Sequence, residues 1–369
     1  MYSYRHWCAL VLAWICAGAQ GQILIGQTVG LTGAVAATVK EARAGAMLYI
    51  DSVNAKGGVR GEKIELVTLD DKFDPQRAVE NARILIEEKN VLALFLNRGT
   101  PHTEAIMPLL AKYDVALIAP STGAMLLHKP VSRQIFNVRS SYQREARKAI
   151  AHLSTVGVTR IAVVHADDSF GQDGLTGTLD GLSVAQLKPV AVLKINRDKP
   201  DYASVVPTLI KSEAQTVVWI GSGTAVTDGI KALRAAGSSA QVVTFSNNAS
   251  AGFVKLLGDN SRGVIITQVL PSEHAYSYAF IKEANELARS HDNLELSPAV
   301  LEGFVSAKVL VEALRRASPK PTREKIIAAL NGMHRFDLGG LEVSYSPNNH
   351  TGLDFADLSI VGADGKFKR

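Results

Sequence analysis

The sequence has almost no cysteine. Its 369 residues include only Cys8 and Cys16, both near the start of the chain. The remaining residues therefore cannot form disulfides or supply a thiol for catalysis. We expect the stability of the protein to come from a buried hydrophobic core, which a chain of this length can provide.

Long apolar runs and blocks of one charge are also missing. After the first 20 residues, no apolar stretch is long enough to span a bilayer. The 40 Lys and Arg residues exceed the 35 Asp and Glu residues and give a formal net charge of +5, but they are dispersed along the chain. Without a basic block, the sequence gives no support for a nucleic-acid partner.

Common nucleotide, metal and nucleophile motifs are absent as well. No G-x-x-x-x-G-K-[ST] loop occurs, and no G-x-G-x-x-G follows the first predicted strand. The nine histidines are scattered without an H-x-x-x-H pair. A secreted hydrolase would need a nucleophile–base pair, which the sequence does not offer. We therefore expect a protein that is not an enzyme and that carries no cofactor or metal.

Two pairs of adjacent carboxylates follow predicted strands, at Asp70-Asp71 and at Asp167-Asp168. Metal binding or acid–base chemistry would use such pairs. Turns and helix starts also favour Asp, because its side chain accepts hydrogen bonds from nearby backbone N–H groups. We favour the turn and capping interpretation for both pairs.

The first residues have the pattern of a secretory signal peptide. Arg5 precedes an apolar run over residues 8–17, and Ala17-Gly18-Ala19 is a small-x-small cleavage site. We expect cleavage after Ala19, so that residues 1–19 are removed on export. An uncleaved anchor is the alternative. A lipoprotein signal at Cys16 is a poor match, because bulky residues precede this cysteine.

The rest of the chain alternates between strand and helix patterns, which indicates parallel sheets covered by helices. A first series runs from a strand at residues 23–29 to one at residues 115–118. The pattern restarts at residue 135 and continues to a strand at residues 263–268. Three helices near residues 275–291, 298–317 and 322–330 follow, and residues 339–369 predict short strands. Two such series predict two lobes, each with a doubly wound parallel sheet.

A polar turn follows each of two neighbouring predicted strands, residues 91–96 and 115–118. The turns are Asn97-Arg98-Gly99-Thr100-Pro101 and Pro120-Ser121-Thr122-Gly123. In an open α/β sheet, ligands bind outside the carboxyl ends of the strands. Hydroxyl and backbone N–H groups at these ends could hold a small polar ligand. Ordinary turns of this fold would have the same composition, so both interpretations stay open.

Residues 53–66, VNAKGGVRGEKIEL, and their continuation at residues 70–75 closely resemble the type I periplasmic binding proteins. The resemblance extends in order through residues 117–122, 161–171 and 233–237, and so covers nearly all of the chain after the predicted signal peptide. It is strongest to the leucine/isoleucine/valine-binding branch, whose members serve ABC importers.

The resemblance implies an α/β fold of two doubly wound parallel-sheet lobes joined by a three-stranded hinge. It assigns residues 20–139 and 270–353 to lobe 1, and residues 140–269 and 354–369 to lobe 2. The three crossings then fall near residues 138–139, 269–270 and 354–355. A ligand would be enclosed between the lobes, and the protein is expected to be a monomer.

The resemblance also implies site residues. By position, Thr100 matches a strand-end hydroxyl that binds the ligand carboxylate, and Ser121, Thr122 and Gly123 form the next contact loop. Three further positions fall where the family carries cleft aromatics, although only the second keeps a ring here: Thr38, Phe170 and Ser222. Tyr142, which follows a predicted strand, either stacks on the ligand or is a half-buried core residue.

Ser246 is the main departure from the amino-acid-binding members, which place a carboxylate near this position to pair with the ligand ammonium. A buried ammonium without a compensating charge is costly. We therefore favour, slightly, a carboxylate-bearing ligand without a recognised ammonium. Asp167 or Asp168 could still supply the missing charge.

The function implied by the resemblance is that of a periplasmic receptor for a small carboxylate ligand, an amino acid or a related organic or aromatic acid. Its partner would be the membrane permease of an ABC importer. A sensory receptor on the same fold, which signals to a membrane protein, is the alternative.

Overall fold

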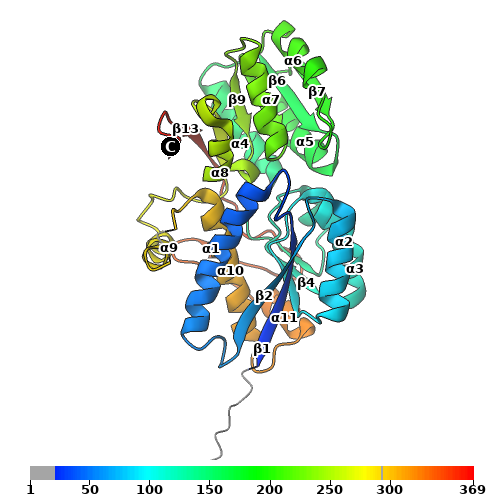
Figure 1. The fold of residues 1–369 in the computed structure, drawn as a ribbon, viewed down its shortest axis with the longest axis vertical. Coiled ribbons are helices and arrows are strands. Elements are labelled where there is room, and N and C mark those ends of the chain that lie inside the picture. The colour runs from blue at the N-terminus through cyan, green and yellow to red at the C-terminus, as the bar shows by residue number, and fades with distance from the viewer. Residues whose placement is uncertain (1–20, 292–293) are drawn as a thin grey trace, which may run out of the picture.

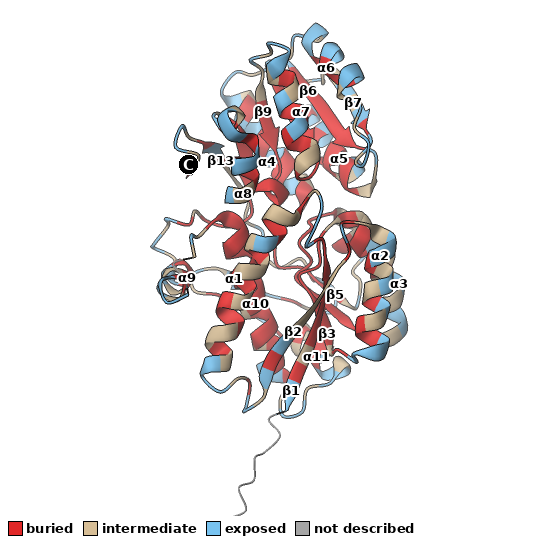
Figure 2. Ribbon diagram, viewed as in Figure 1, coloured by how far each residue is buried: buried red, intermediate tan, exposed pale blue. Residues whose placement is uncertain are grey.

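The computed structural model describes residues 21–291 and 294–369, so the predicted signal peptide lies outside the described residues. The chain forms two α/β lobes, which lie one above the other in Figure 1. The central strands of both sheets are buried, whereas edge strands such as β2 and β7 and the outer faces of the covering helices are partly exposed (Figure 2). No helix within the described residues is both long and apolar enough to cross a membrane.

The first lobe contains a five-stranded parallel sheet in the order β2-β1-β3-β4-β5. β1 and β2 pair in register over eight residues, and the short central strands β3 and β4 are completely buried. Burial on both faces explains why these central strands are continuous apolar runs. The strands are β1 (Gln22–Val29), β2 (Lys63–Asp70), β3 (Ala93–Phe95), β4 (Ala116–Ile118) and β5 (Ile135–Phe136).

Helices cover both faces of this sheet. Apolar residues of α1, α9, α10 and α11 form one core with one face of the sheet, and those of α2 and α3 form a second core with the other. α1 and α10 cross closely, because a Cβ on Gly303 would lie only 1.8 Å from the Ala42 carbonyl oxygen. The helices are α1 (Ala36–Ala55), α2 (Pro75–Arg83), which continues as a π-helical turn (Ile84–Glu88), α3 (Thr100–Tyr113), α9 (Ala279–Arg289), α10 (Pro298–Ala317) and α11 (Arg323–Asn331).

The second lobe contains a seven-stranded sheet in the order β14-β13-β10-β9-β8-β6-β7. β13 and β14, from the end of the chain, pair antiparallel, and the other strands are parallel. The strands are β6 (Ile161–Ala166), β7 (Ala191–Ile195), β8 (Thr216–Ile220), β9 (Gln241–Thr244), β10 (Ile265–Gln268), β13 (Asp357–Val361) and β14 (Phe367–Lys368). The helices are α4 (Tyr142–Thr155), α5 (Ser169–Val184), α6 (Tyr202–Lys211), α7 (Thr224–Ala235) and α8 (Ala251–Leu257). β11 (Phe336–Asp337) and β12 (Glu342–Val343) form a separate two-stranded sheet.

The chain passes between the two large sheets three times. It leaves the first sheet after β5, returns to the first lobe with α9 to α11 after β10, and ends in the second sheet with β13 and β14. The predicted α/β class with two doubly wound lobes is therefore confirmed. Element ends differ by a few residues. The strand predicted at residues 135–138 ends at Phe136, because the Asn137 N–H donates to the His350 carbonyl instead of extending the sheet.

The loop between β2 and α2 has an uncommon backbone conformation. Lys72 and Phe73 have φ values of 54° and 61°, in the left-handed region that bulky residues rarely adopt. Asp71, which is fully buried, accepts hydrogen bonds from the Phe73 N–H (2.8 Å) and the Thr28 hydroxyl (3.1 Å). The turn chemistry predicted for Asp70-Asp71 is thus confirmed, and it fixes the position of the Phe73 ring.

This loop generates a pH-dependent prediction. Burial raises the pKa of Asp71, and this effect exceeds the opposite effect of its hydrogen bonds. The net pKa is about 6, compared with an ordinary value of 3.8. The folded state therefore binds the proton more tightly than the unfolded state, and ionisation of Asp71 costs stability as the pH rises. Between pH 4 and pH 7, the free energy of unfolding of the wild type should fall by roughly 2–3 kcal/mol relative to Asp71→Asn, at about 1.4 kcal/mol per pKa unit.

Urea unfolding of both proteins across this pH range measures the difference. Asn can keep the hydrogen bond from the Phe73 N–H through its carbonyl oxygen and can donate from its NH2 group to the Thr28 hydroxyl, and it does not ionise. A constant difference between the two proteins from pH 4 to pH 7 would show that Asp71 titrates normally.

Candidate functional site

A small cavity lies between the two lobes, at the carboxyl ends of the strands. The empty space among its lining atoms is about 220 Å³. Loops after β2, β3 and β4 supply one side, and the starts of lobe-2 helices and the loops before them supply the other. The lining residues are Phe73, Arg98, Gly99, Thr100, Ser121, Tyr142, Phe170, Arg197, Ser222 and Asn247.

Five of the nine predicted site residues line this cavity. They come from both lobes and bring together hydroxyl groups and aromatic rings. The Tyr142 ring packs on Phe170 at a centroid distance of 4.8 Å and on Phe245 at 5.8 Å. Tyr142 is therefore fully buried rather than half-buried, and it still reaches the cavity. The five residues are Thr100, Ser121, Tyr142, Phe170 and Ser222.

Three predicted residues lie nearby but do not line the cavity. Thr122 is behind Thr100, with which it shares a hydroxyl hydrogen bond of 2.7 Å. Gly123 packs against the hinge segment, where its carbonyl accepts from the Tyr142 N–H and an added Cβ would lie 2.5 Å from the Ser140 carbonyl oxygen. The Thr38 hydroxyl bonds to that of Ser250 across the lobe interface.

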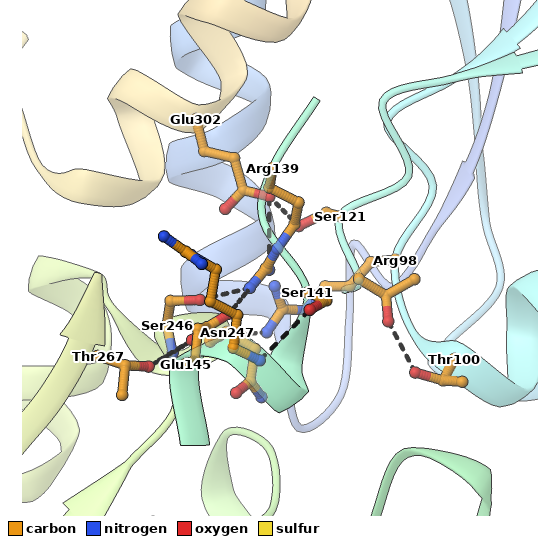
Figure 3. A network of polar contacts seen from close by, with 12 residues as sticks. Arg98, Thr100, Ser121, Arg139, Ser141, Glu145, Ser246, Asn247, Thr267 and Glu302 are labelled. Carbon is orange, nitrogen blue, oxygen red and sulfur yellow. Dashed lines mark hydrogen bonds and ion pairs between the residues drawn. The ribbon is translucent and has the colours of Figure 1, made fainter. Parts of the chain in front are cut away.

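Ser246 is also placed differently from the expectation. Its hydroxyl accepts a hydrogen bond from Arg139 (2.5 Å), and its N–H donates to Glu145 (3.0 Å) and to the Thr267 hydroxyl (2.8 Å). It belongs to a buried network beside the cavity (Figure 3). A side chain with these partners does not face a ligand, so its identity does not by itself decide whether an ammonium is recognised.

The same network holds Arg139, which lies between the lobes. Its guanidinium forms ion pairs with Glu145 of α4 (2.5 Å) and with Glu302 of α10 (3.7 Å). Burial alone would lower the pKa of Arg139, but Tyr142 and the two carboxylates raise it above its usual value. Ser121, on the cavity wall, donates to Glu302 (2.9 Å). The network therefore joins both lobes to one wall of the cavity.

Arg98 is the cationic residue that the sequence-based site omitted. Only 4% of its surface is exposed, and burial lowers the pKa of its guanidinium, which nevertheless remains charged. One terminal nitrogen donates to the Asn247 carbonyl across the cleft (2.5 Å), and Nε has no hydrogen-bond partner. In contrast to Arg139, it forms no ion pair with an Asp or Glu among the described residues. An unpaired buried cation is costly, and an anion in the cavity would remove that cost.

The backbone adds positive potential. α3 and α7 begin after Gly99 and Gly223, and neither helix has a side-chain N-cap. Gly99 has a φ of 99°, which favours glycine at this turn into α3. Thr100 and Ser222, beside these helix starts, line the cavity. The positive end of the α3 dipole therefore faces the same space as Arg98, whereas the first residues of α7 line the neighbouring outer space.

The remaining wall is aromatic and polar. The Phe73 ring stacks on the His102 ring with their centroids 4.5 Å apart. The Arg197 guanidinium lies 4.9 Å from the centroid of the same Phe73 ring. Arg197 also pairs with Asp168. Within the part of the chain that the structure describes, no Asp, Glu or aliphatic side chain lines the cavity. Such a wall suits a small anion with a planar group better than an ammonium or a branched alkyl chain.

The missed residues carried a partial sequence signal. Arg98, Phe73 and Arg197 all follow the carboxyl end of a predicted strand, as the residues of an α/β ligand site should. Arg98 lies in the turn that contains Thr100. However, the sequence does not show that its guanidinium is buried without a carboxylate, since this depends on the closure of the second lobe.

Comparison with known proteins supports the architecture. Residues 22–364 match the periplasmic binding protein family. A substrate-binding periplasmic protein from Ralstonia solanacearum is 32% identical, with a TM-score of 0.87 over 94% of this chain and 99% of that one. A Leu/Ile/Val-binding protein from Rhizobium johnstonii is 25% identical over 321 residues, which are 85% of this chain and 84% of that protein.

An amino acid binding protein from Pseudomonas aeruginosa is 26% identical over 207 residues, 55% of this chain. This match spans only 54% of that protein's length. On the match over residues 22–364, the chain belongs to the periplasmic binding proteins, a family of solute-binding proteins rather than enzymes, and it resembles their leucine/isoleucine/valine-binding branch.

Proposed function

We propose that the protein is the extracytoplasmic receptor of an ABC importer and that it binds a small carboxylate between its lobes. The buried and unpaired guanidinium of Arg98 is the observation that carries this proposal. The carboxylate would lie against Arg98 and the hydroxyls of Thr100 and Ser121. Hydrogen bonds to charged groups contribute about 1.5–3 kcal/mol each, so a few such contacts suffice for specific binding.

Among the described residues, no carboxylate lines the cavity to pair with a ligand ammonium. Asp167, which might have supplied one, pairs with Lys194 at the surface (3.2 Å), and Asp168 pairs with Arg197. Glu145 and Glu302 are engaged by Arg139. We therefore infer that the ligand is an organic acid without a recognised ammonium, of the compact planar or aromatic class. This class differs from the ligands named for the Leu/Ile/Val-binding relatives.

The lobes are in contact, as expected for a closed receptor. The Thr224 N–H donates to the Ala34 carbonyl across the interface (3.2 Å). Glu41 of α1 accepts hydrogen bonds from the first N–H groups of α8, those of Ala251 (3.0 Å) and Gly252 (2.6 Å). We propose that the hinge lies near residues 138–139, 269–270 and 354–355. Lobe 1 would then contain residues 20–139 and 270–353, and lobe 2 residues 140–269 and 354–369.

The family's role favours a periplasmic receptor that delivers its ligand, as a monomer, to a membrane permease, after cleavage of residues 1–19. A sensory receptor on the same fold is the second candidate. Neighbouring genes for a permease and an ATPase would distinguish transport from signalling.

The ligand class can be tested by calorimetry with phenylglyoxylate and phenylglycine, two compact aromatic acids that differ by an oxo group in place of the ammonium. The oxo acid should bind at least tenfold tighter, about 1.4 kcal/mol. Thr100→Ala should weaken the oxo acid, whereas the control Thr176→Ala, on the exposed face of α5, should not. Tighter binding of phenylglycine would show that an ammonium is recognised. Unchanged affinity in Thr100→Ala would show that the carboxylate lies elsewhere.

Ligand binding should close the lobes, because contacts to both lobes favour the closed arrangement over the open one. Small-angle scattering should give a smaller radius of gyration at saturation with the oxo acid than without it. A radius that does not change at saturation would contradict a hinged receptor.

A further inference from the structure

We propose that Phe73 and Arg197 form a gate that closes the cavity behind the bound acid and limits the length of the ligand. The inference rests on the proposed carboxylate site and adds the determinant of ligand size. The gate consists of one side chain from each lobe, Phe73 from the β2–α2 loop and Arg197 from the loop after β7.

The two gate residues separate two spaces. On the inner side is the cavity, with about 220 Å³ of empty space, and Arg98 is one of its lining residues. On the outer side is a larger space of about 760 Å³ that opens to solvent, which we call the vestibule. Phe73, Arg197 and Ser222 line both spaces. A ligand too long for the cavity would have to extend past these side chains.

The gate is a stack of three flat groups. The Phe73 ring lies between His102, at 4.5 Å with an interplanar angle of 20°, and the Arg197 guanidinium, at 4.9 Å. Asp168, at the start of α5, holds Arg197 by an ion pair. Since Phe73 and His102 belong to lobe 1 and Arg197 to lobe 2, the stack is complete only when the lobes are closed. Its cation–π contact then contributes to closure.

The backbone of Phe73 supports the same role. A phenylalanine with a φ of 61° is unfavourable, and buried Asp71 holds the loop in this conformation. Such residues persist where the surrounding structure imposes them, and they concentrate at binding sites. Here the constraint keeps the ring at the boundary of the cavity, with only 8% of the residue exposed.

The vestibule differs chemically from the cavity. Lys72, Asp198 and Asp228 give it charges of both signs, whereas the cavity has only arginines as charged residues. With the gate closed, ligands are limited to compact acids that fit within the cavity. With the gate opened, the vestibule would accept the far end of a longer acid while Arg98 still holds the carboxylate.

Calorimetric titration with benzoate and biphenyl-4-carboxylate tests the gate, because both acids carry a carboxylate on a phenyl ring and only the second acid has a further ring. The wild type should bind benzoate at least 100-fold tighter. Phe73→Ala should reduce this preference at least tenfold. Arg197→Gln should reduce it in the same direction, and it leaves the core around Phe73 intact. Arg77→Gln, an exposed arginine of α2 that lines neither space, should keep the wild-type preference.

Each outcome has a definite meaning. Equal binding of both acids to the wild type would overturn the gate and leave the carboxylate site standing. An unchanged preference in both gate variants would also overturn it. If the wild type binds neither acid, the proposed ligand class is wrong, and the size limit based on it is wrong too.

Discussion

A buried guanidinium without a carboxylate partner is the constraint on which this account depends. Within the described residues, Arg98 is held at the boundary of the two lobes by one hydrogen bond to the Asn247 carbonyl, and it forms no ion pair. A protein interior rarely keeps a buried cation without an ion pair unless an anionic ligand binds beside it. The neighbouring helix starts and the absence of Asp and Glu from the cavity wall act in the same direction. Together these features favour an anionic ligand over a neutral or cationic ligand of the same shape.

Arg139 provides a useful contrast. It is as deeply buried as Arg98, but Glu145 from one lobe and Glu302 from the other neutralise it. One arginine thus connects the two lobes, and the other has no carboxylate partner among the described residues. Glu302 also favours the positive charge of Arg98, although it forms no ion pair with it, whereas Arg139 and Arg197 oppose that charge.

The sequence predicted the fold well, because buried parallel strands are apolar runs and polar turns mark their carboxyl ends. It also placed Thr100, Ser121 and Tyr142 at the cavity. It failed where side-chain direction decides the outcome. Ser246 follows a strand as expected, but its hydroxyl is used by Arg139. Arg98 lies in the same turn as the predicted residue Thr100. However, Arg98 is buried by contact between the two lobes, and no local sequence pattern predicts such a contact.

A double-mutant cycle between Arg98 and the ligand carboxylate tests the central claim most directly. The affinities of benzoate and benzamide would be measured by calorimetry for the wild type and for Arg98→Gln, with the exposed Arg160→Gln as control. The account predicts that the wild type prefers benzoate and that Arg98→Gln loses about 1.5–3 kcal/mol of this preference, the range for a hydrogen bond to a charged group. The control should retain the preference. An equal preference for benzoate in Arg98→Gln and the wild type would show that Arg98 does not hold the carboxylate.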